Sequence, residues 1–254
     1  MQKFFVEEKQ IDEGSGTITI LGEDVNHIKN VLRCIEGEHI EVCEKSDTPK
    51  KYICEISSLN SAEITCNIIE KLEKNNEAPI KLHIFQGLPK AEKMELIIQK
   101  CTELGAYEFV PVDMKRCVVK LNGKDESKKI ARWQKIAEVA SKQCGRDIIP
   151  KVANKISVKE LITLIQDYDM IIVAYENEHT KFLKEVLRNQ KTKNKIMNIA
   201  LIIGPEGGID ISEIELLEKA NVNIVSLGKR ILRTETAPIV LSSIIMYELG
   251  DIGG

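Results

Sequence analysis

The sequence predicts an α/β protein in which a small β-rich module precedes a larger domain built on a mostly parallel sheet. Two observations carry this prediction. Residues 1–72 contain short β-prone runs about every 12 residues. From residue 81 onward, apolar runs of strand length alternate with segments of helical periodicity. Residues 72–78 are polar and charged, and we expect the domain boundary there.

In the first module, turn signals separate the β-prone runs. We expect strands at residues 3–6, 16–21, 39–43, 52–56 and 63–69, with a turn at residues 47–50. One helix is predicted at residues 23–34, where Val25, Ile28, Val31 and Leu32 share a face. A small β-barrel with one helix fits this pattern.

The larger domain alternates strands and helices, which is typical of a parallel sheet covered by helices on both faces. The predicted strands are residues 81–86, 108–112, 170–174, 199–203 and 222–227. The predicted helices are residues 90–104, 125–144, 158–166, 180–188, 211–220 and 237–249.

Local signals mark the start of two helices. Asp210 and Glu213 form a D-x-x-E capping pattern for the helix at 211–220. Thr236 is expected to cap the last helix, with Pro238 in its first turn. That last helix is apolar on nearly all sides, which indicates either deep burial or a dimer interface.

Composition excludes several classes of protein. No apolar run among the 254 residues approaches the roughly 20 needed to span a membrane. The first residues lack a signal peptide's apolar core, so we expect a cytoplasmic protein. Seven cysteines without a CxxC pair and four histidines without HxxxH spacing predict neither disulfides nor a metal site. We expect reduced cysteines that pack as small apolar residues.

Charge is unevenly distributed along the chain. Residues 1–72 hold 8 basic and 14 acidic side chains, whereas residues 73–150 hold 15 basic and 11 acidic ones. The middle third is therefore the better candidate for a surface that faces a polyanion, although a solvated helix face gives the same count.

Two loops are the best candidates for a ligand site. Residues 204–208 (GPEGG) and 228–236 (GKRILRTET) each follow an apolar strand, so both should lie at the carboxyl edge of the sheet, where open α/β folds bind ligands. No GxxxxGK[ST] or GxGxxG motif occurs. Glu206 would repel a phosphate, which favours a neutral or cationic ligand or ribose hydroxyls. A tight turn without a ligand explains residues 204–208 equally well.

The second loop combines charge with apolar side chains. Arg230 and Arg233 flank Ile231 and Leu232, and Glu235 follows. An apolar pair in a loop is costly unless it is buried or covers a ligand ring. The arginines are suited to an anionic substrate, or to salt bridges on the surface.

Five stretches together resemble the RsmE family. They are residues 203–208 (IGPEGG), 227–237 (LGKRILRTETA), 27–33 (HIKNVLR), 88–90 (LPK) leading into 98–105 (IQKCTELG), and 140–146 (ASKQCGR). The family comprises SPOUT-class methyltransferases that use S-adenosylmethionine to modify N3 of a uridine in 16S ribosomal RNA. Lys93 departs from the arginine that is common at its position.

The resemblance implies further features of the fold. Residues 1–72 would be a PUA-like β-barrel associated with RNA binding, and residues 73–254 a SPOUT domain with a deep C-terminal trefoil knot. S-adenosyl-L-methionine would lie bent in the knot of a homodimer, without a metal. The partner would be 16S ribosomal RNA or the small ribosomal subunit.

The resemblance and the residue chemistry together suggest roles for individual positions. The expected cofactor contacts lie in three strand-end loops: Ala174, Tyr175, Glu176, Ile203, Gly204, Glu206, Gly207, Leu227, Gly228, Ile231, Leu232 and Thr234. Uridine N3 carries a weakly acidic proton, so the enzyme must remove it or stabilise the resulting anion. The catalytic candidates are Arg230, Arg233, Glu235 and Arg116. The RNA-binding candidates are Arg33, Lys90, Lys100, Lys142 and Arg146.

Three questions stay open at this point. Glu235 is suited either to orient an arginine or to act as the base. Either Glu176 or Glu206 is suited to accept from ribose hydroxyls, or each only stabilises a helix N-terminus. The alternative functions are a SPOUT methyltransferase that modifies the 2′-hydroxyl of a ribose, and a non-catalytic RNA-binding factor of ribosome assembly.

Overall fold

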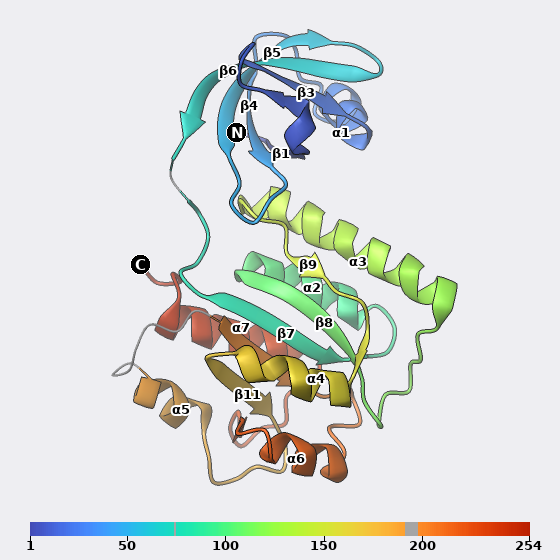
Figure 1. Ribbon diagram of the computed structural model, residues 1–254, viewed down its shortest axis with the longest axis vertical. Coiled ribbons are helices and arrows are strands. Elements are labelled where there is room, and N and C mark those ends of the chain that lie inside the picture. The colour runs from blue at the N-terminus through green and yellow to red at the C-terminus, as the bar shows by residue number, and fades with distance from the viewer. Residues whose placement is uncertain (74, 191–197) are drawn as a thin grey trace. The chain divides into compact units, whose positions relative to one another are not determined.

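A computed structural model describes residues 1–73, 75–190 and 198–254 (Figure 1). The chain forms two compact units. Unit 1 contains residues 1–77 and 141–149, and unit 2 contains residues 78–140 and 150–254. Part of the expected boundary segment, Lys74, lies outside the described residues.

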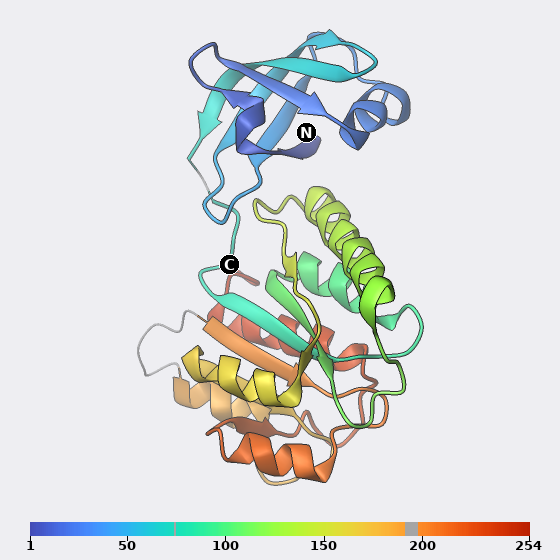
Figure 2. The ribbon, with the colours of Figure 1, turned by 45° about the vertical axis from the view of Figure 1, so that its right-hand side comes forward.

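Unit 1 is organised around a six-stranded sheet with the order β1-β4-β5-β6-β3-β2. Strand β1 pairs with β4 in parallel, and the other pairs are antiparallel. The sheet is strongly curled (Figure 2). The strands are β1 Lys3–Val6, β2 Ile11–Asp12, β3 Thr17–Leu21, β4 His39–Glu44, β5 Lys51–Leu59 and β6 Glu63–Leu72. All five predicted strands of this module are thus present.

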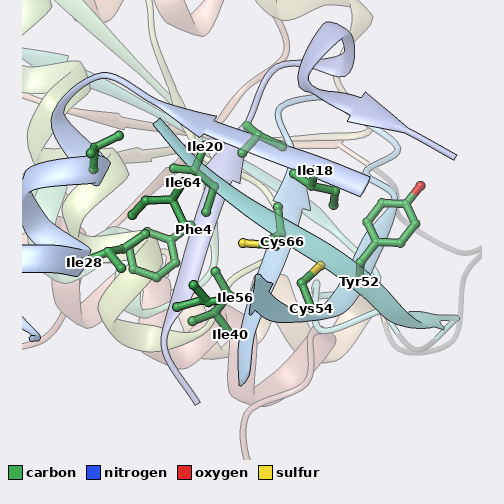
Figure 3. Close-up of a cluster of buried hydrophobic side chains, with 13 residues drawn as sticks. Phe4, Ile18, Ile20, Ile28, Ile40, Tyr52, Cys54, Ile56, Ile64 and Cys66 are labelled. Carbon is green, nitrogen blue, oxygen red and sulfur yellow. The ribbon is translucent and has the colours of Figure 1, made fainter. Parts of the chain in front are cut away.

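The core of unit 1 consists of side chains that alternate along these strands (Figure 3). Ile18, Ile40, Ile56 and Ile64 are at most 1% exposed, and Tyr52 closes one end of the cluster. Full burial of one such side chain contributes roughly 1.5–3 kcal/mol, so this cluster is the main source of the unit's stability.

The helical segment of unit 1 differs from the prediction. An α-helical turn, α1 (Glu23–Asn26), continues as a π-helix, His27–Val31, and Arg33 then adopts a φ of 58°. In this wider turn the N–H of Leu32 donates to the carbonyl of His27, five residues earlier, at 2.9 Å. Val25 and Ile28 are buried as expected, but Val31 is 60% exposed, because the π-turn rotates it off the apolar face.

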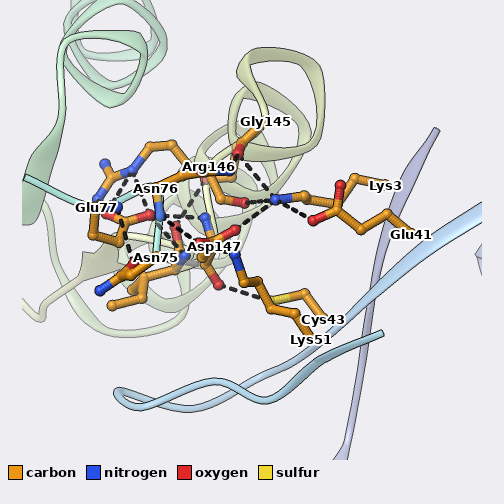
Figure 4. A network of polar contacts seen from close by, with 12 residues as sticks. Lys3, Glu41, Cys43, Lys51, Asn75, Asn76, Glu77, Gly145, Arg146 and Asp147 are labelled. Carbon is orange, nitrogen blue, oxygen red and sulfur yellow. Dashed lines mark hydrogen bonds and ion pairs between the residues drawn. The ribbon is translucent and has the colours of Figure 1, made fainter. Parts of the chain in front are cut away.

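A buried polar network joins residues 75–77 and 145–147 to the sheet of unit 1 (Figure 4). The carboxylate of Asp147, which is 0% exposed, accepts from Lys3 Nζ at 2.7 Å and Lys51 Nζ at 2.8 Å. It also accepts from the backbone N–H of Asn76 at 2.7 Å. Glu77 binds the Arg146 guanidinium beside it. These contacts explain why residues 141–149 belong to unit 1.

Unit 2 contains a seven-stranded sheet in which every described pair of strands is parallel. The order is β10-β8-β7-β12-β11-β13, with β9 beside β8. The strands are β7 Lys81–Gly87, β8 Ala106–Asp113, β9 Lys151–Val152, β10 Ile156–Ser157, β11 Met170–Ala174, β12 Asn198–Ile203 and β13 Asn223–Val225. The predicted α/β class with a mostly parallel sheet is confirmed. The strands β9 and β10 were not predicted, because two residues each are too few to show a periodicity in the sequence.

Helices cover both faces of this sheet (Figures 1 and 2). Helices α2 and α7 contact each other on one face, and α4 packs against β8 and α6 on the other. The helices are α2 Lys93–Glu103, α3 Gly123–Cys144, α4 Val158–Leu164, α5 Leu183–Gln190, α6 Ile211–Glu218 and α7 Thr236–Leu249. None of the described helices is long and apolar enough to cross a membrane.

The two predicted helix caps have different outcomes. Asp210 and Glu213 form the expected capping box at the start of α6. Thr236 is not the cap of α7: it is the first helical residue, and the N-cap Glu235 makes no capping hydrogen bond with its side chain. The Glu235 carboxylate instead faces a lysine of α2.

Candidate functional site

The carboxyl ends of the parallel strands bring five loops to one edge of the unit 2 sheet. Residues 204–208, called the first loop, follow β12. Residues 228–235, called the second loop, lie between β13 and α7. Residues 88–92, 114–122 and 175–182 follow β7, β8 and β11 at the same edge. The predicted pair of loops therefore lies at the expected edge of the sheet.

A buried polar joint connects the two loops. Thr234 Oγ1 donates to the carbonyl of Gly204 at 2.7 Å. Gln86, at the end of β7, donates from Nε2 to Thr234 Oγ1 at 3.0 Å and to the Gly204 carbonyl at 3.3 Å. Gln86 is 0% exposed, and its Oε1 has no hydrogen-bond partner among the described residues. A buried acceptor of this kind is costly unless a ligand or water satisfies it.

An ammonium group makes a second connection between the loops. Lys93, in the first turn of α2, lies 3.0 Å from Glu206 Oε1 and 3.2 Å from Glu235 Oε2. Glu206 also accepts from the backbone N–H of Lys90 at 2.9 Å. Burial alone would raise the pKa of Glu206, but these hydrogen bonds hold it below its usual range. The carboxylate of Glu206 is therefore directed at α2.

The first loop is too tightly packed to tolerate larger residues. A Cβ on Gly204 would lie 2.8 Å from Ile209 Cγ1, and one on Gly207 would lie 3.2 Å from Arg116 Cβ. Gly208 has a φ of 71°, and a Cβ there would lie 1.9 Å from the carboxylate of Glu176. These glycines allow the loops after β8, β11 and β12 to approach each other closely.

Arg116 extends the site from the loop after β8. Its Nη1 donates to the Gly207 carbonyl at 3.1 Å, and its Nε lies 3.4 Å from Asp210 Oδ2. The side chain remains 43% exposed. Arg116 therefore presents charge beside the first loop, and its catalytic role stays a prediction.

The side chains of the second loop are divided between solvent and interior. Arg230, Ile231 and Arg233 are exposed, and Ile231 reaches 84% exposure. Leu232 is half-buried, and Thr234 is buried in the joint with Gly204. The exposed Ile231 side chain is available to cover a ligand ring, so its expected place over an adenine stays a prediction.

An apolar groove of about 890 Å³ lies beside the start of the second loop. It is lined by Leu227 and Gly228, together with residues of α5 and α7. Its size is within the range of small-molecule pockets. Other expected cofactor residues lie at the same edge of the sheet: Ala174 is the last residue of β11, Tyr175 follows it, and Ile203 is buried at the end of β12.

The predicted RNA-binding residues have different environments. Arg33 and Lys90 are exposed. Lys100 pairs with Glu103 at 2.8 Å, and Lys142 pairs with Asp24 at 2.8 Å. Arg146 is only 6% exposed and binds Glu77, so it does not fit a role in contacting phosphate.

Sequence reasoning missed Gln86 and Lys93 as parts of the site. A signal for Gln86 exists, because a glutamine that ends an apolar strand of a parallel sheet needs a polar partner. For Lys93, no spacing in the sequence indicates that its partners lie more than a hundred residues away. Among the described residues, no group of three or more His, Cys, Asp or Glu side chains is arranged to hold a metal.

Comparison with known proteins defines the class of unit 2. A family model described as an RNA methyltransferase domain matches residues 76–246. The ribosomal RNA small subunit methyltransferase E of Bacillus subtilis (strain 168) is 40% identical over 250 residues, covering 98% of this chain and 97% of that protein. The protein of the same name from Mesomycoplasma hyopneumoniae (strain 232) is 35% identical over 242 residues, covering 95% of this chain and 97% of that protein.

Solved structures agree with this class. The ribosomal RNA small subunit methyltransferase E of Neisseria gonorrhoeae, bound to S-adenosyl methionine, matches with a TM-score of 0.84 at 27% identity, over 99% of both chains. A protein from Legionella pneumophila in complex with the same cofactor matches with a TM-score of 0.86 at 28% identity, over 99% of this chain and 100% of that one. The chain thus belongs to the RNA methyltransferases, in the ribosomal RNA small subunit methyltransferase E (RsmE) family. The resemblance seen in the sequence is confirmed.

Proposed function

We propose that this protein transfers a methyl group from S-adenosyl-L-methionine to N3 of a uridine in 16S ribosomal RNA. The observation that carries the proposal is the joint between Gly204 and Thr234, which brings a glycine-rich loop and an arginine-bearing loop together at one sheet edge. Relatives across the whole length of the chain are ribosomal RNA small subunit methyltransferases, and related structures hold the cofactor.

The residues at this edge fit the cofactor. Adenosine is flat and neutral, and the groove beside Leu227 and Gly228 offers it an apolar surface and backbone groups. Gly228 has open space where a Cβ would stand, and the buried Oε1 of Gln86 is an acceptor in need of a donor. When bound, the cofactor supplies an electrophilic methyl group on a sulfonium. This chain's task is to hold the cofactor and present the acceptor nitrogen in line.

The charged residues of the site are suited to the loss of the N3 proton. Arg230 and Arg233 are exposed on the second loop, where they can bind the negative charge that develops on the uracil oxygens. Arg116 presents a third guanidinium beside the first loop. Glu235 lies 3.2 Å from Lys93 and 3.9 Å from Arg233, which favours a role in orienting these cations. The proposal therefore assigns anion stabilisation to the arginines.

Strand order supports a trefoil knot in unit 2. Strand β12 lies between β7 and β11, and the chain then crosses β11 to form β13 on its other side. Thr234 is buried against Gly204 before the chain returns as α7, which packs on β12 and α2. We propose that these crossings form the knot that the family resemblance implies. Residues 1–72 would supply the PUA-like, RNA-binding barrel, with Arg33 exposed on it.

Exposed apolar side chains on α7 support a homodimer. Tyr247 is 67% exposed and Ile244 is 38% exposed, and Phe182 lies at the same groove with 40% exposure. A patch of this kind rimmed by polar residues marks an interaction site. We propose that a second copy of this chain covers Ile244 and Tyr247, whereas the cofactor occupies the end of the groove at Leu227 and Gly228. The cytoplasm, where ribosomes are assembled, is the proposed location.

Methylation of purified RNA tests the proposed function directly. The protein is incubated with small ribosomal subunits and with naked 16S ribosomal RNA, each with labelled S-adenosyl-L-methionine, and the digested nucleosides are identified by mass spectrometry. We expect labelled 3-methyluridine. A labelled 2′-O-methyl nucleoside would replace the N3 assignment with ribose methylation.

Cofactor binding separates an enzyme from a non-catalytic assembly factor. Calorimetry with S-adenosyl-L-methionine should show binding to the wild type. Gly204→Val should abolish that binding, because a Cβ at this position meets Ile209 and the backbone of Gly208. RNA affinity should be nearly unchanged in the same variant. If Gly204→Val still binds the cofactor, the first loop is not its site.

A further inference from the structure

Lys93 is the feature of unit 2 that the family resemblance leaves without a role. Its Nζ lies 3.0 Å from Glu206 of the first loop and 3.2 Å from Glu235 of the second. The three side chains are between 14% and 29% exposed, so water screens the contacts only in part. One cation on α2 thus neutralises an acid from each loop.

The two carboxylates would oppose each other without this cation. Because both oxygens contact the same nitrogen, they are separated by about 6 Å at most, a distance at which one carboxylate disfavours ionisation of the other. The hydrogen bond from Lys93 to Glu206 is the main reason that the pKa of Lys93 is raised, although burial acts in the opposite direction. Lys93 therefore stays charged near neutral pH and can pair with both carboxylates.

We infer that Lys93 is a positioning residue that holds the first and second loops together and thereby sets the affinity for the cofactor. The inference rests on the proposed function, since those loops form the proposed cofactor site. The joint between Gly204 and Thr234 depends on the same closeness of the loops. Repulsion between Glu206 and Glu235 would act to separate them.

Other charged groups lie around this bridge and do not replace it. The nearest cation to Glu235 besides Lys93 is Arg233, at 3.9 Å and with an 82% exposed side chain. Lys90 contributes only its backbone N–H to Glu206. Other charged groups on the neighbouring elements include Glu92 and Glu95 beside Arg132, Lys115 and Arg116 beside Asp210, Glu176 against Gly208, and the exposed Lys229 and Arg230.

The inference predicts a pH dependence that a purely structural lysine would not produce. In Lys93→Met at pH 8, two ionised carboxylates would face each other when the loops are closed, and their repulsion would oppose closure. Affinity for S-adenosyl-L-methionine should then be about tenfold weaker than wild type at pH 8, which corresponds to a coupling of one pKa unit. It should recover toward the wild-type value as the pH falls to about 5.5, because protonation relieves the repulsion.

Three further variants make the test specific. Lys93→Arg keeps the charge and should retain most of the affinity at pH 8. Lys93→Met combined with Glu235→Gln removes the repulsion without altering an expected cofactor contact, and it should recover affinity at pH 8 relative to the single variant. Lys128→Met removes an exposed lysine from α3 of the same unit and should bind like the wild type at every pH.

Calorimetry from pH 5.5 to 8 and hydrogen exchange of the cofactor-free protein provide the two readouts. At pH 8, amides of residues 204–208 and 228–235 should be less protected in Lys93→Met than in the wild type, after correction for intrinsic exchange. Unchanged affinity and unchanged protection in Lys93→Met would overturn the inference, as would a double variant no better than the single one. A wild type that binds no cofactor would overturn the proposed function, whereas the exchange data would still decide whether Lys93 holds the loops.

Discussion

Gly208 shows how one position constrains the candidate site. Its φ of 71° lies in the left-handed region, and the carboxylate of Glu176 occupies the space where a side chain would begin. A Cβ at this residue would force the Glu176 side chain to move away from the first loop. Sequence pattern identifies the glycine-rich turn, but it does not indicate which glycine meets which neighbour.

Comparison of two glycines separates backbone strain from steric contact. Gly16 has nearly the same φ, 70°, but no atom lies within 4 Å of the position of its Cβ. Gly16→Ala should cost about 1 kcal/mol of unfolding free energy through strain alone. Gly208→Ala should cost more and should also weaken cofactor binding, because Glu176 must move. Denaturant unfolding measures the loss of unfolding free energy, and calorimetry measures the cofactor affinity. Equal effects of the two substitutions would contradict the steric account.

The seven cysteines differ in their expected reactivity. Burial raises the pKa of the Cys54, Cys66 and Cys101 thiols to about 12, so these thiols stay protonated near neutral pH. Cys144 is exposed. Brief treatment with iodoacetamide at pH 8 should therefore modify Cys144 well before these three, as measured by peptide mass spectrometry. Alkylation of Cys101 as fast as Cys144 in the native protein would contradict the burial described for α2.

At the scale of the element, strands were easier to predict than the ends of helices. The strand at 170–174 has the predicted bounds, because a buried parallel strand is an uninterrupted apolar run. The helix at 23–34 was predicted as one α-helix, but its second half is a π-helix. Apolar spacing does not distinguish the two forms over so few residues. The cap was expected at Thr236 because of its residue type, which does not reveal that the helix already begins at this residue.

The segment containing Asp147 tests how buried charges define unit 1. Asn at this position would remove the buried anion that the ammonium groups of Lys3 and Lys51 share. Breaking a buried ion pair in this way costs about 3–5 kcal/mol. Asp147→Asn should therefore lower the unfolding free energy by about this amount at pH 7, as measured by urea unfolding. Glu103→Gln is the control, since its helical pair with Lys100 contributes only about 0.2–0.5 kcal/mol.

The same carboxylate predicts the direction of a pH effect. Burial alone would raise the pKa of Asp147, but hydrogen bonds from Lys3 and Lys51 bring it below its usual value. A lowered folded-state pKa means that the stabilisation is fully present above the unfolded value, about 3.9, and is lost as the pH falls through the folded value. The difference between wild type and Asp147→Asn should thus shrink in acid. A difference that grows below pH 4 would contradict this assignment.

At the scale of the whole molecule, the sequence predicted that a β-rich module precedes an α/β domain. It did not predict that a later segment of the chain belongs to unit 1. Residues 141–149 follow the 63 residues of unit 2 from 78 to 140 and yet belong to unit 1 with the sheet. Their inclusion depends on contacts of Asp147 and Arg146 with residues that are distant in sequence. For the candidate site, motifs identified the two loops, whereas the bridge from Lys93 needed the fold.

Helix α7 carries the prediction that concerns assembly. Leu241 and Ile245 are 0% exposed and pack inside unit 2, while Tyr247 projects from the same helix with 67% exposure. A helix that is apolar on all sides is normally buried, so the outer side of α7 is expected to pack against another protein surface. We expect the wild type to sediment as a dimer and Tyr247→Lys to sediment as a monomer with little change in thermal stability. Leu164→Lys, which alters a 48% exposed leucine on α4, should remain dimeric. A monomeric wild type, or a dimer that tolerates Tyr247→Lys, would show that the outer side of α7 is not the interface between two copies.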